Sequence, residues 1–81
     1  MKVKVRYFAS LREAAGVDHE FFEVPDQHSM VGLLFDQIKV KYQFNLGQDL
    51  VRASVNGRYA SMKTELKSED EIVFIPPVSG G

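Results

Sequence analysis

The stretch SMVGLLFDQIKVKY, residues 29–42, carries the clearest structural signal in this chain of 81 residues. Its apolar side chains recur three, four, seven and eleven positions after the first valine, which is the spacing of one face of an α-helix. We expect Ser29 to cap this helix and Gly32 to allow close packing against it. The core face of the helix is expected to consist of Val31, Leu34, Phe35, Ile38 and Tyr42.

The residues before this helix predict two strands joined by a short helical turn. Polar and apolar residues alternate over residues 1–9, which is typical of a half-buried strand, with Val3, Val5 and Tyr7 on one side. Ser10 is expected to cap the following turn, with Glu13 at the capping-box position and Gly16 closing it. Residues 18–24 are expected to form the second strand.

The residues after the helix predict a hairpin and a final strand. Asn56-Gly57 is typical of a type I′ turn, and it lies between expected strands at residues 51–55 and 58–60. An acidic turn at residues 67–71 then leads into the last strand, residues 72–75. One long helix against a mixed sheet indicates an α+β fold.

Composition excludes several classes of protein. Ten basic and eleven acidic residues give a net charge of −1, which argues against a nucleic-acid or membrane-surface binder. The chain contains no cysteine, so it has no disulfide, thiolate metal site or thiol nucleophile. No apolar run approaches the roughly 20 residues of a membrane span, and the alternating start is unlike a signal peptide. We therefore expect a cytoplasmic protein.

Catalytic side chains are scarce. His19 and His28 are the only imidazoles, and neither has partners at the spacing of metal ligands. The run Glu69-Asp70-Glu71 is more typical of a solvated loop than of paired catalytic carboxylates. No glycine-rich framework for binding phosphate is present. We expect no metal site and no active site within this chain.

The last residues form the most distinctive feature of the sequence. Gly80 and Gly81 follow a proline pair, Pro76-Pro77, and neither glycine has a Cβ that would widen the backbone. The segment 76–81 is expected to be a flexible, extended tail after a domain of residues 1–75, with a reach of roughly 20 Å. Such a tail fits into a narrow channel of another protein, although two terminal glycines also arise by chance.

Two residues near the first strand are candidates for contact with a partner. Phe8 falls on the strand face that otherwise carries basic residues, where it is either an interface anchor or covered by the last strand or the tail. Arg12 is either part of a docking surface or the partner of Glu13 in a surface ion pair.

Three blocks of sequence resemble one known family. They are VKVRYFASLREAAG at residues 3–16, VNG at residues 55–57 and FIPPVSGG at residues 74–81. The family is the small, sulfur-carrier subunit of molybdopterin synthase, often called MoaD. The resemblance covers essentially the whole chain and implies a ubiquitin-like β-grasp fold. One departure is Glu69, where relatives often have glycine, and it puts the conformation of that turn in doubt.

The resemblance also implies a mechanism. An E1-like adenylyltransferase would use ATP to adenylate the carboxylate of Gly81, and a sulfur donor of cysteine desulfurase or rhodanese type would convert it to a thiocarboxylate. The tail would then enter the large synthase subunit, in a heterotetramer of two small and two large subunits. There it would give its sulfur to cyclic pyranopterin monophosphate to make the molybdopterin dithiolene. No cofactor would be bound to the chain itself.

The site residues implied by this resemblance lie mainly in the tail. Gly81 would carry the reacting group and Gly80 would keep the backbone thin. The expected partner contacts are Phe8, Arg12, Phe74, Pro76, Pro77, Val78 and Ser79.

Three alternatives remain open at this stage. The chain could be a sulfur carrier for thiamine synthesis or tRNA thiolation, or a ubiquitin-like modifier conjugated through Gly81. It could also be a plain binding module whose tail is idle.

Overall fold

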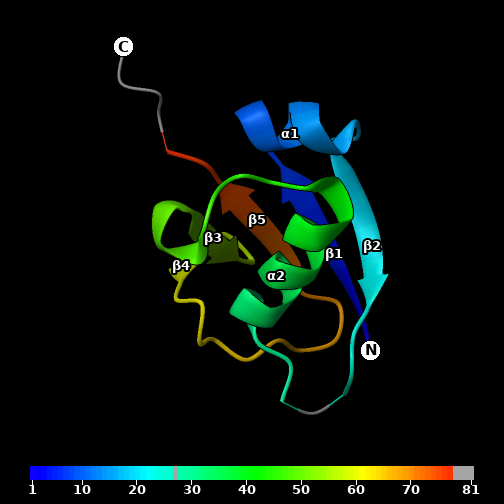
Figure 1. Ribbon diagram of the computed structural model, residues 1–81. Coiled ribbons are helices and arrows are strands. Elements are labelled where there is room, and N and C mark those ends of the chain that lie inside the picture. Colours follow the sequence, from blue (N-terminus) through cyan, green and yellow to red (C-terminus); the bar gives the residue numbers. More distant parts are fainter. Residues whose placement is uncertain (27, 78–81) are drawn as a thin grey trace.

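The computed structural model describes residues 1–26 and 28–77. Five strands, two α-helices and one 3₁₀ helix make up this part of the chain (Figure 1). In chain order they are β1 (Lys2–Tyr7), α1 (Ala9–Ala15), β2 (His19–Glu23), α2 (Val31–Tyr42), η1 (Gln48–Leu50), β3 (Arg52–Val55), β4 (Arg58–Ala60) and β5 (Glu71–Ile75).

The five strands form one mixed sheet in the order β2-β1-β5-β3-β4. β1 and β5 are parallel, while the other three neighbouring pairs are antiparallel. Figure 1 shows α2 lying across one face of the sheet and α1 at the end where β1 and β5 finish. The expected α+β architecture with one main helix is confirmed. Within the described residues, no helix is both long and apolar enough to cross a membrane.

The core lies between α2 and the covered face of the sheet. Every second residue of β1 is buried, as the alternation predicts, and so are Ile72 and Phe74 of β5. The rings of Phe35 and Phe74 are 5.2 Å apart between centroids, which joins the helix to the central strands. The predicted helical stripe is buried apart from Tyr42, which packs partly exposed at its end.

The predicted cap of α2 is wrong. The cap residue is Met30, whereas the Ser29 hydroxyl donates to the carbonyl of Pro25 at 2.7 Å. The first amides of the helix instead donate to carbonyls of a distant segment. Val31 N–H donates to the carbonyl of Thr64, and Gly32 N–H donates to the carbonyl of Met62. Tertiary contacts therefore satisfy the donors that a serine cap would have satisfied.

The predicted start of α1 is also wrong. The helix begins at Ala9 with Phe8 as its cap residue, so Ser10 lies inside the first turn and makes no capping hydrogen bond. The carbonyl of Phe8 accepts from the amides of Leu11 and Arg12, which closes the turn without a capping box. The predicted end is confirmed, because Gly16 has the left-handed φ of 78° and donates to the carbonyl of Arg12 at 2.9 Å.

Two further predictions about glycines are confirmed. Asn56 and Gly57 have φ angles of 52° and 85°, as a type I′ turn requires, and they connect the paired residues Val55 and Arg58. At Gly32, a Cβ would lie 3.0 Å from the backbone oxygen of Met62, closer than most Cβ contacts, so glycine favours this approach of the chain to α2.

Candidate functional site

Because β1 and β5 are parallel, the chain leaves both strands at the same end of the sheet. Tyr7, the last residue of β1, lies level with Phe74, the residue before the end of β5. Phe8 and α1 therefore begin where Pro76 and Pro77 leave the sheet (Figure 1). We call the exposed residues Phe8, Arg12 and Pro77 at this end the tail-exit surface.

Phe8 is presented to solvent at the tail-exit surface. Its backbone is extended, and Ala9 then takes a left-handed φ of 51°, which turns the chain into α1. The turn allows Leu11 to enter the core at 2% exposure while Phe8 stays 48% exposed. The last strand does not cover Phe8, so an interface anchor is the alternative that the described residues favour.

Arg12 is also exposed, on α1. In the part of the chain that the structure describes, no carboxylate forms an ion pair with it, so the pair with Glu13 is not formed. Of the two alternatives for Arg12, the described residues therefore favour a docking surface beside Phe8.

Phe74 was expected to contact a partner, but it is buried in the folded domain. Its side chain is 0% exposed and packs on Phe35, because it faces the helix side of β5. It stabilises the core and has no surface to offer in the folded domain. Pro76 is buried as well, whereas Pro77 is exposed.

The other expected tail residues, Val78, Ser79, Gly80 and Gly81, lie outside the described residues.

The two histidines do not form a catalytic group. Nδ1 of His19 lies 2.7 Å from Oδ1 of Asp18, and this hydrogen bond lowers the pKa of Asp18. His28 is exposed in the loop before α2. Among residues 1–26 and 28–77, no group of three or more potential ligands could hold a metal ion.

The sequence predicted a solvated loop at Asp70. For this residue the prediction is wrong, because Asp70 is buried. It is 7% exposed. Oδ1 accepts a hydrogen bond from the side chain of Asn56 at 2.8 Å, and Oδ2 accepts one from the amide of Lys67 at 2.7 Å. Asn56 also accepts from the amide of Glu71, so the hairpin turn is tied to the start of β5.

A second polar group that the sequence reasoning missed surrounds Glu20. Its carboxylate accepts hydrogen bonds from the hydroxyls of Tyr7 and Tyr42 and from Nζ of Lys41. Burial alone would raise the pKa of Glu20, but these donors outweigh it and lower the pKa. Burial and the bond to Glu20 raise the pKa of Tyr7. The group joins β1, β2 and the end of α2.

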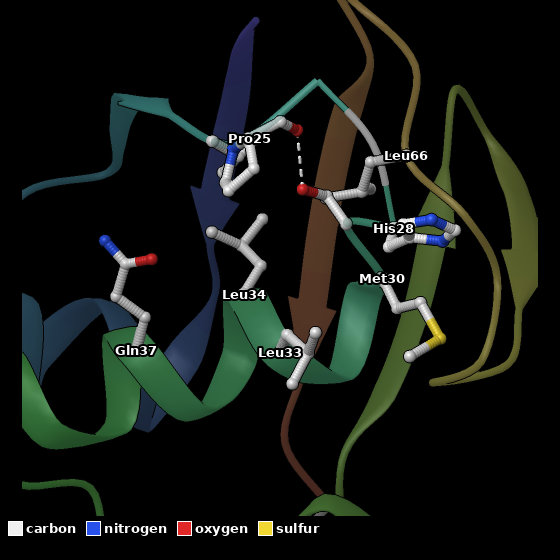
Figure 2. Close-up of a pocket in the computed structure, with 9 residues that line it drawn as sticks. Pro25, His28, Met30, Leu33, Leu34, Gln37 and Leu66 are labelled. Carbon is white, nitrogen blue, oxygen red and sulfur yellow. Dashed lines mark hydrogen bonds between the residues drawn. The ribbon is translucent and has the colours of Figure 1, made fainter.

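One hollow in the described part of the chain lies away from the tail-exit surface. It has a volume of about 170 Å³ and lies between the start of α2 and the preceding loop (Figure 2). Apolar side chains such as Leu33 and Leu34 line it, and the Ser29 hydroxyl beside them is already bound to the carbonyl of Pro25. Besides Ser29, its polar lining residues in the described part of the chain are His28 and Gln37.

Known proteins that resemble this chain have the fold described above, and they identify its family. Residues 5–81 match the model of the ThiS family, and the chain belongs to that family. The predicted relationship to molybdopterin synthase sulfur carrier subunits is also confirmed. Proteins of that name from Chlamydomonas reinhardtii and Mycobacterium tuberculosis are 37% and 39% identical to the chain. The first match covers all of both chains, and the second covers 100% of this chain and 99% of the relative.

Solved structures confirm the ubiquitin-like β-grasp fold. A putative molybdopterin converting factor subunit 1 from Pyrococcus furiosus is 41% identical, with a TM-score of 0.79 over 96% of this chain and 99% of that one. Small archaeal modifier protein 1 from Methanosarcina acetivorans is 30% identical, with a TM-score of 0.78 over 99% and 96%. A complex of subunits 1 and 2 of the molybdopterin-converting factor from Helicobacter pylori contains a chain of the same fold, at 24% identity, a TM-score of 0.68 and full coverage of both chains.

Proposed function

We propose that this chain is the sulfur carrier subunit of a molybdopterin synthase and that Gly81 carries the sulfur. The observation that supports this most is that the family match continues through Gly80 and Gly81, in a chain that aligns over its whole length with a relative named molybdopterin synthase sulfur carrier subunit. The chain contains no cysteine, so sulfur cannot be carried on it as a persulfide, and the terminal carboxylate is the group that we propose carries it.

The proposed chemistry begins with a poor electrophile. A terminal carboxylate has a pKa of about 3.3–3.7 and is ionised at neutral pH. Its oxygen attacks the α-phosphate of ATP in an E1-like adenylyltransferase, which forms an acyl-adenylate and releases pyrophosphate. The outer sulfur of a persulfide, on a donor of cysteine desulfurase or rhodanese type, then attacks the acyl carbon and expels AMP, which forms an acyl disulfide. A second thiol attacks the donor's sulfur in that acyl disulfide, forms a disulfide with the donor and releases the acyl-bound sulfur. The product is a thiocarboxylate on Gly81.

The geometry at the end of β5 supports the use of this carboxylate by another protein. Pro76 is buried, so the chain is held to the domain until Pro77, which is exposed. Proline fixes φ, which lowers the entropy that a bound tail would lose. Val78 and Ser79 would follow into the channel of the partner, with Gly80 keeping the backbone narrow. Phe8 and Arg12 would contact the partner at the mouth of that channel.

The acceptor in this proposal is cyclic pyranopterin monophosphate, bound in the large synthase subunit. Two charged carriers, used one after the other, would supply the two dithiolene sulfurs of molybdopterin. The Helicobacter pylori complex supports a pairing of small and large subunits, and we propose a heterotetramer of two of each. The chain would bind no cofactor, ATP would be used by the activating enzyme, and the reaction would take place in the cytoplasm.

The similarity to small archaeal modifier protein 1 favours a second candidate function. In that function Gly81 would be joined to lysine side chains of target proteins by isopeptide bonds. The same activated carboxylate serves both functions, and the nucleophile that expels AMP distinguishes them. A carrier for thiamine synthesis or tRNA thiolation would differ from the proposed function only in its acceptor.

Reconstitution tests the proposal. The chain, the activating enzyme, ATP, a sulfur source and the large subunit of the same organism are incubated with cyclic pyranopterin monophosphate, and molybdopterin is measured as its fluorescent oxidation product. We expect product with the full chain and none after deletion of Gly81. A thiocarboxylate that forms but yields no molybdopterin would indicate another acceptor, and product from the deleted chain would contradict the proposal.

A further inference from the structure

The face of the sheet opposite α2 has no helix over it in the described residues (Figure 1). Residues paired across neighbouring strands point to the same face of a sheet. Since Val3, Val5 and Tyr7 point into the core, Lys2, Lys4 and Arg6 point to the open face. We call this the outer sheet face.

The strand register assigns the rest of the outer sheet face. Arg6 pairs with His19 and Val73, Val73 pairs with Ser54, and Ser54 pairs with Tyr59. Lys4 pairs with Phe21 and Glu71, and Arg52 pairs with Ile75. The face therefore carries a row from each strand: Lys2, Lys4, Arg6, His19, Phe21, Glu23, Arg52, Ser54, Tyr59, Glu71, Val73 and Ile75.

Positive charge predominates on this face although the whole chain has a net charge of −1. Lys2, Lys4, Arg6 and Arg52 are opposed there only by Glu23 and Glu71. Glu71 is shared between two cations, at 3.4 Å from Nε of Arg6 and 3.8 Å from Nζ of Lys4. Within the described part of the chain, no carboxylate pairs with Lys2 or Arg52.

The ion pairs of Glu71 are weak enough to be exchanged. The side chains of Arg6 and Glu71 are 41% and 43% exposed. Pairs this exposed contribute little to stability, so a carboxylate from another molecule could replace Glu71 at little cost.

Aromatic side chains stand among these charges. Tyr59 is 81% exposed and Phe21 is 54% exposed. Nζ of Lys2 lies 4.6 Å from the centre of the Phe21 ring, so the ammonium group is held over the aromatic face rather than by an anion. Tyrosine and arginine are enriched where protein surfaces bind one another, whereas isolated exposed lysines are not.

We propose that the outer sheet face is a docking surface for an acidic protein surface, and that this attraction accelerates the encounter that brings the tail to its acceptor. The proposal rests on the proposed function, because its partner is the large synthase subunit. A protein partner fits better than a nucleic acid, since Glu23 and Glu71 interrupt the positive rows and would repel a phosphate backbone. Clustered charge of one sign increases association rates and makes them dependent on salt.

The test measures association rates between the chain and the large subunit of the same organism by stopped flow, from about 0.05 to about 0.5 M NaCl. For the wild type we expect the rate to fall about tenfold or more across this range. Lys4→Gln/Arg6→Gln should be slower at low salt and nearly insensitive to salt. The matched control is Lys63→Gln/Lys67→Gln, which removes two exposed lysines from the segment between β4 and β5 and should behave like the wild type.

Glu71→Gln provides the opposite change. Removing this carboxylate leaves Lys4 and Arg6 unneutralised, so we expect faster association at low salt, whereas a purely structural role for Glu71 would slow it. Two results would overturn the acidic docking surface while leaving the proposed function intact. One is association of the wild type that does not depend on salt. The other is an equal effect of Lys4→Gln/Arg6→Gln and of Lys63→Gln/Lys67→Gln. Absence of association at every salt concentration would overturn both. Tighter salt-dependent binding to a single-stranded DNA oligonucleotide than to the large subunit would overturn the assignment to an acidic protein.

Discussion

The side-chain amide of Asn56 donates a hydrogen bond to Oδ1 of Asp70 across 2.8 Å, and its carbonyl oxygen accepts one from the amide of Glu71 across 2.9 Å. The backbone amide of Asn56 donates in turn to the carbonyl of Glu71 at 2.8 Å. One residue of the hairpin turn is thus bonded to Asp70, just before β5, and to Glu71, the first residue of the strand from which the tail leaves.

Replacing Asn56 by alanine should destabilise the domain by about 1–3 kcal/mol, because it leaves a buried oxygen of Asp70 without a donor. The left-handed φ of 52° adds to the loss, since alanine tolerates it less well than asparagine. Chemical denaturation measures the free energy of unfolding. Arg58→Ala, in β4 of the same hairpin, is the control and should change it by less than about 0.5 kcal/mol. Equal stability of Asn56→Ala and the wild type would contradict this role.

Glu69→Gly should stabilise the protein by about 1 kcal/mol. Glu69 has a φ of 71°, a conformation in which a side chain is strained and glycine is not. The turn is fixed there, because the amide of Glu69 donates to the carbonyl of Lys2 at 2.8 Å. Thermal unfolding should show a higher midpoint. Lys67→Gly, at a position without positive φ, should lower the midpoint instead. A lower midpoint for Glu69→Gly would show that the strain is not relieved.

The contribution of Glu20 to stability should disappear in acid. Because its hydrogen bonds lower the pKa in the folded state, the stabilisation is present above the unfolded value of about 4.3 and is lost as the pH falls through the folded pKa. Wild type should therefore be more stable than Glu20→Gln at pH 7, by about 1 kcal/mol, and the two should converge as the pH falls through the folded pKa of Glu20. Urea denaturation at a series of pH values measures this, and a difference that does not depend on pH would exclude the charge of Glu20 as its origin.

Phe8→Ala should weaken binding of the large subunit about tenfold or more while leaving the fold intact. Phe8 is half exposed beside the exit of the tail, so its removal costs little in the free chain. Val40→Ala on α2 is the matched control, because Val40 is an apolar side chain that is 79% exposed and belongs to a different element. Calorimetric titration gives the Kd values. Equal Kd values for the two variants would show that Phe8 does not contribute to the interface.

Local periodicity in the sequence was sufficient to predict most of the fold. The stripe that begins at Val31 and the alternation that begins at Val3 each mark one face of one element, and the type I′ turn depends on two adjacent residues. Applied to the last strand, the same alternation would have placed Phe74 in the core, two residues after Ile72.

The features that the sequence did not reveal depend on contacts between distant residues. The amides at the start of α2 are bound by carbonyls of Met62 and Thr64, about thirty residues later, so the nearby serine is not needed as a cap. Asp70 is buried because Asn56 reaches it from the hairpin. The closeness of Phe8 to the exit of the tail follows from the parallel pairing of β1 and β5, which no local pattern indicates.

The mass of the intact chain tests the central claim most directly. The chain is incubated with the activating enzyme of its organism, ATP and a sulfur source, and then analysed by mass spectrometry beside a chain that lacks Gly81. We predict replacement of one oxygen by sulfur in the full chain and no change in the shortened one. An unmodified mass in the presence of an enzyme that is active on another carrier, or a mass increased by a conjugated protein instead, would contradict the assignment of Gly81 as a carrier of sulfur.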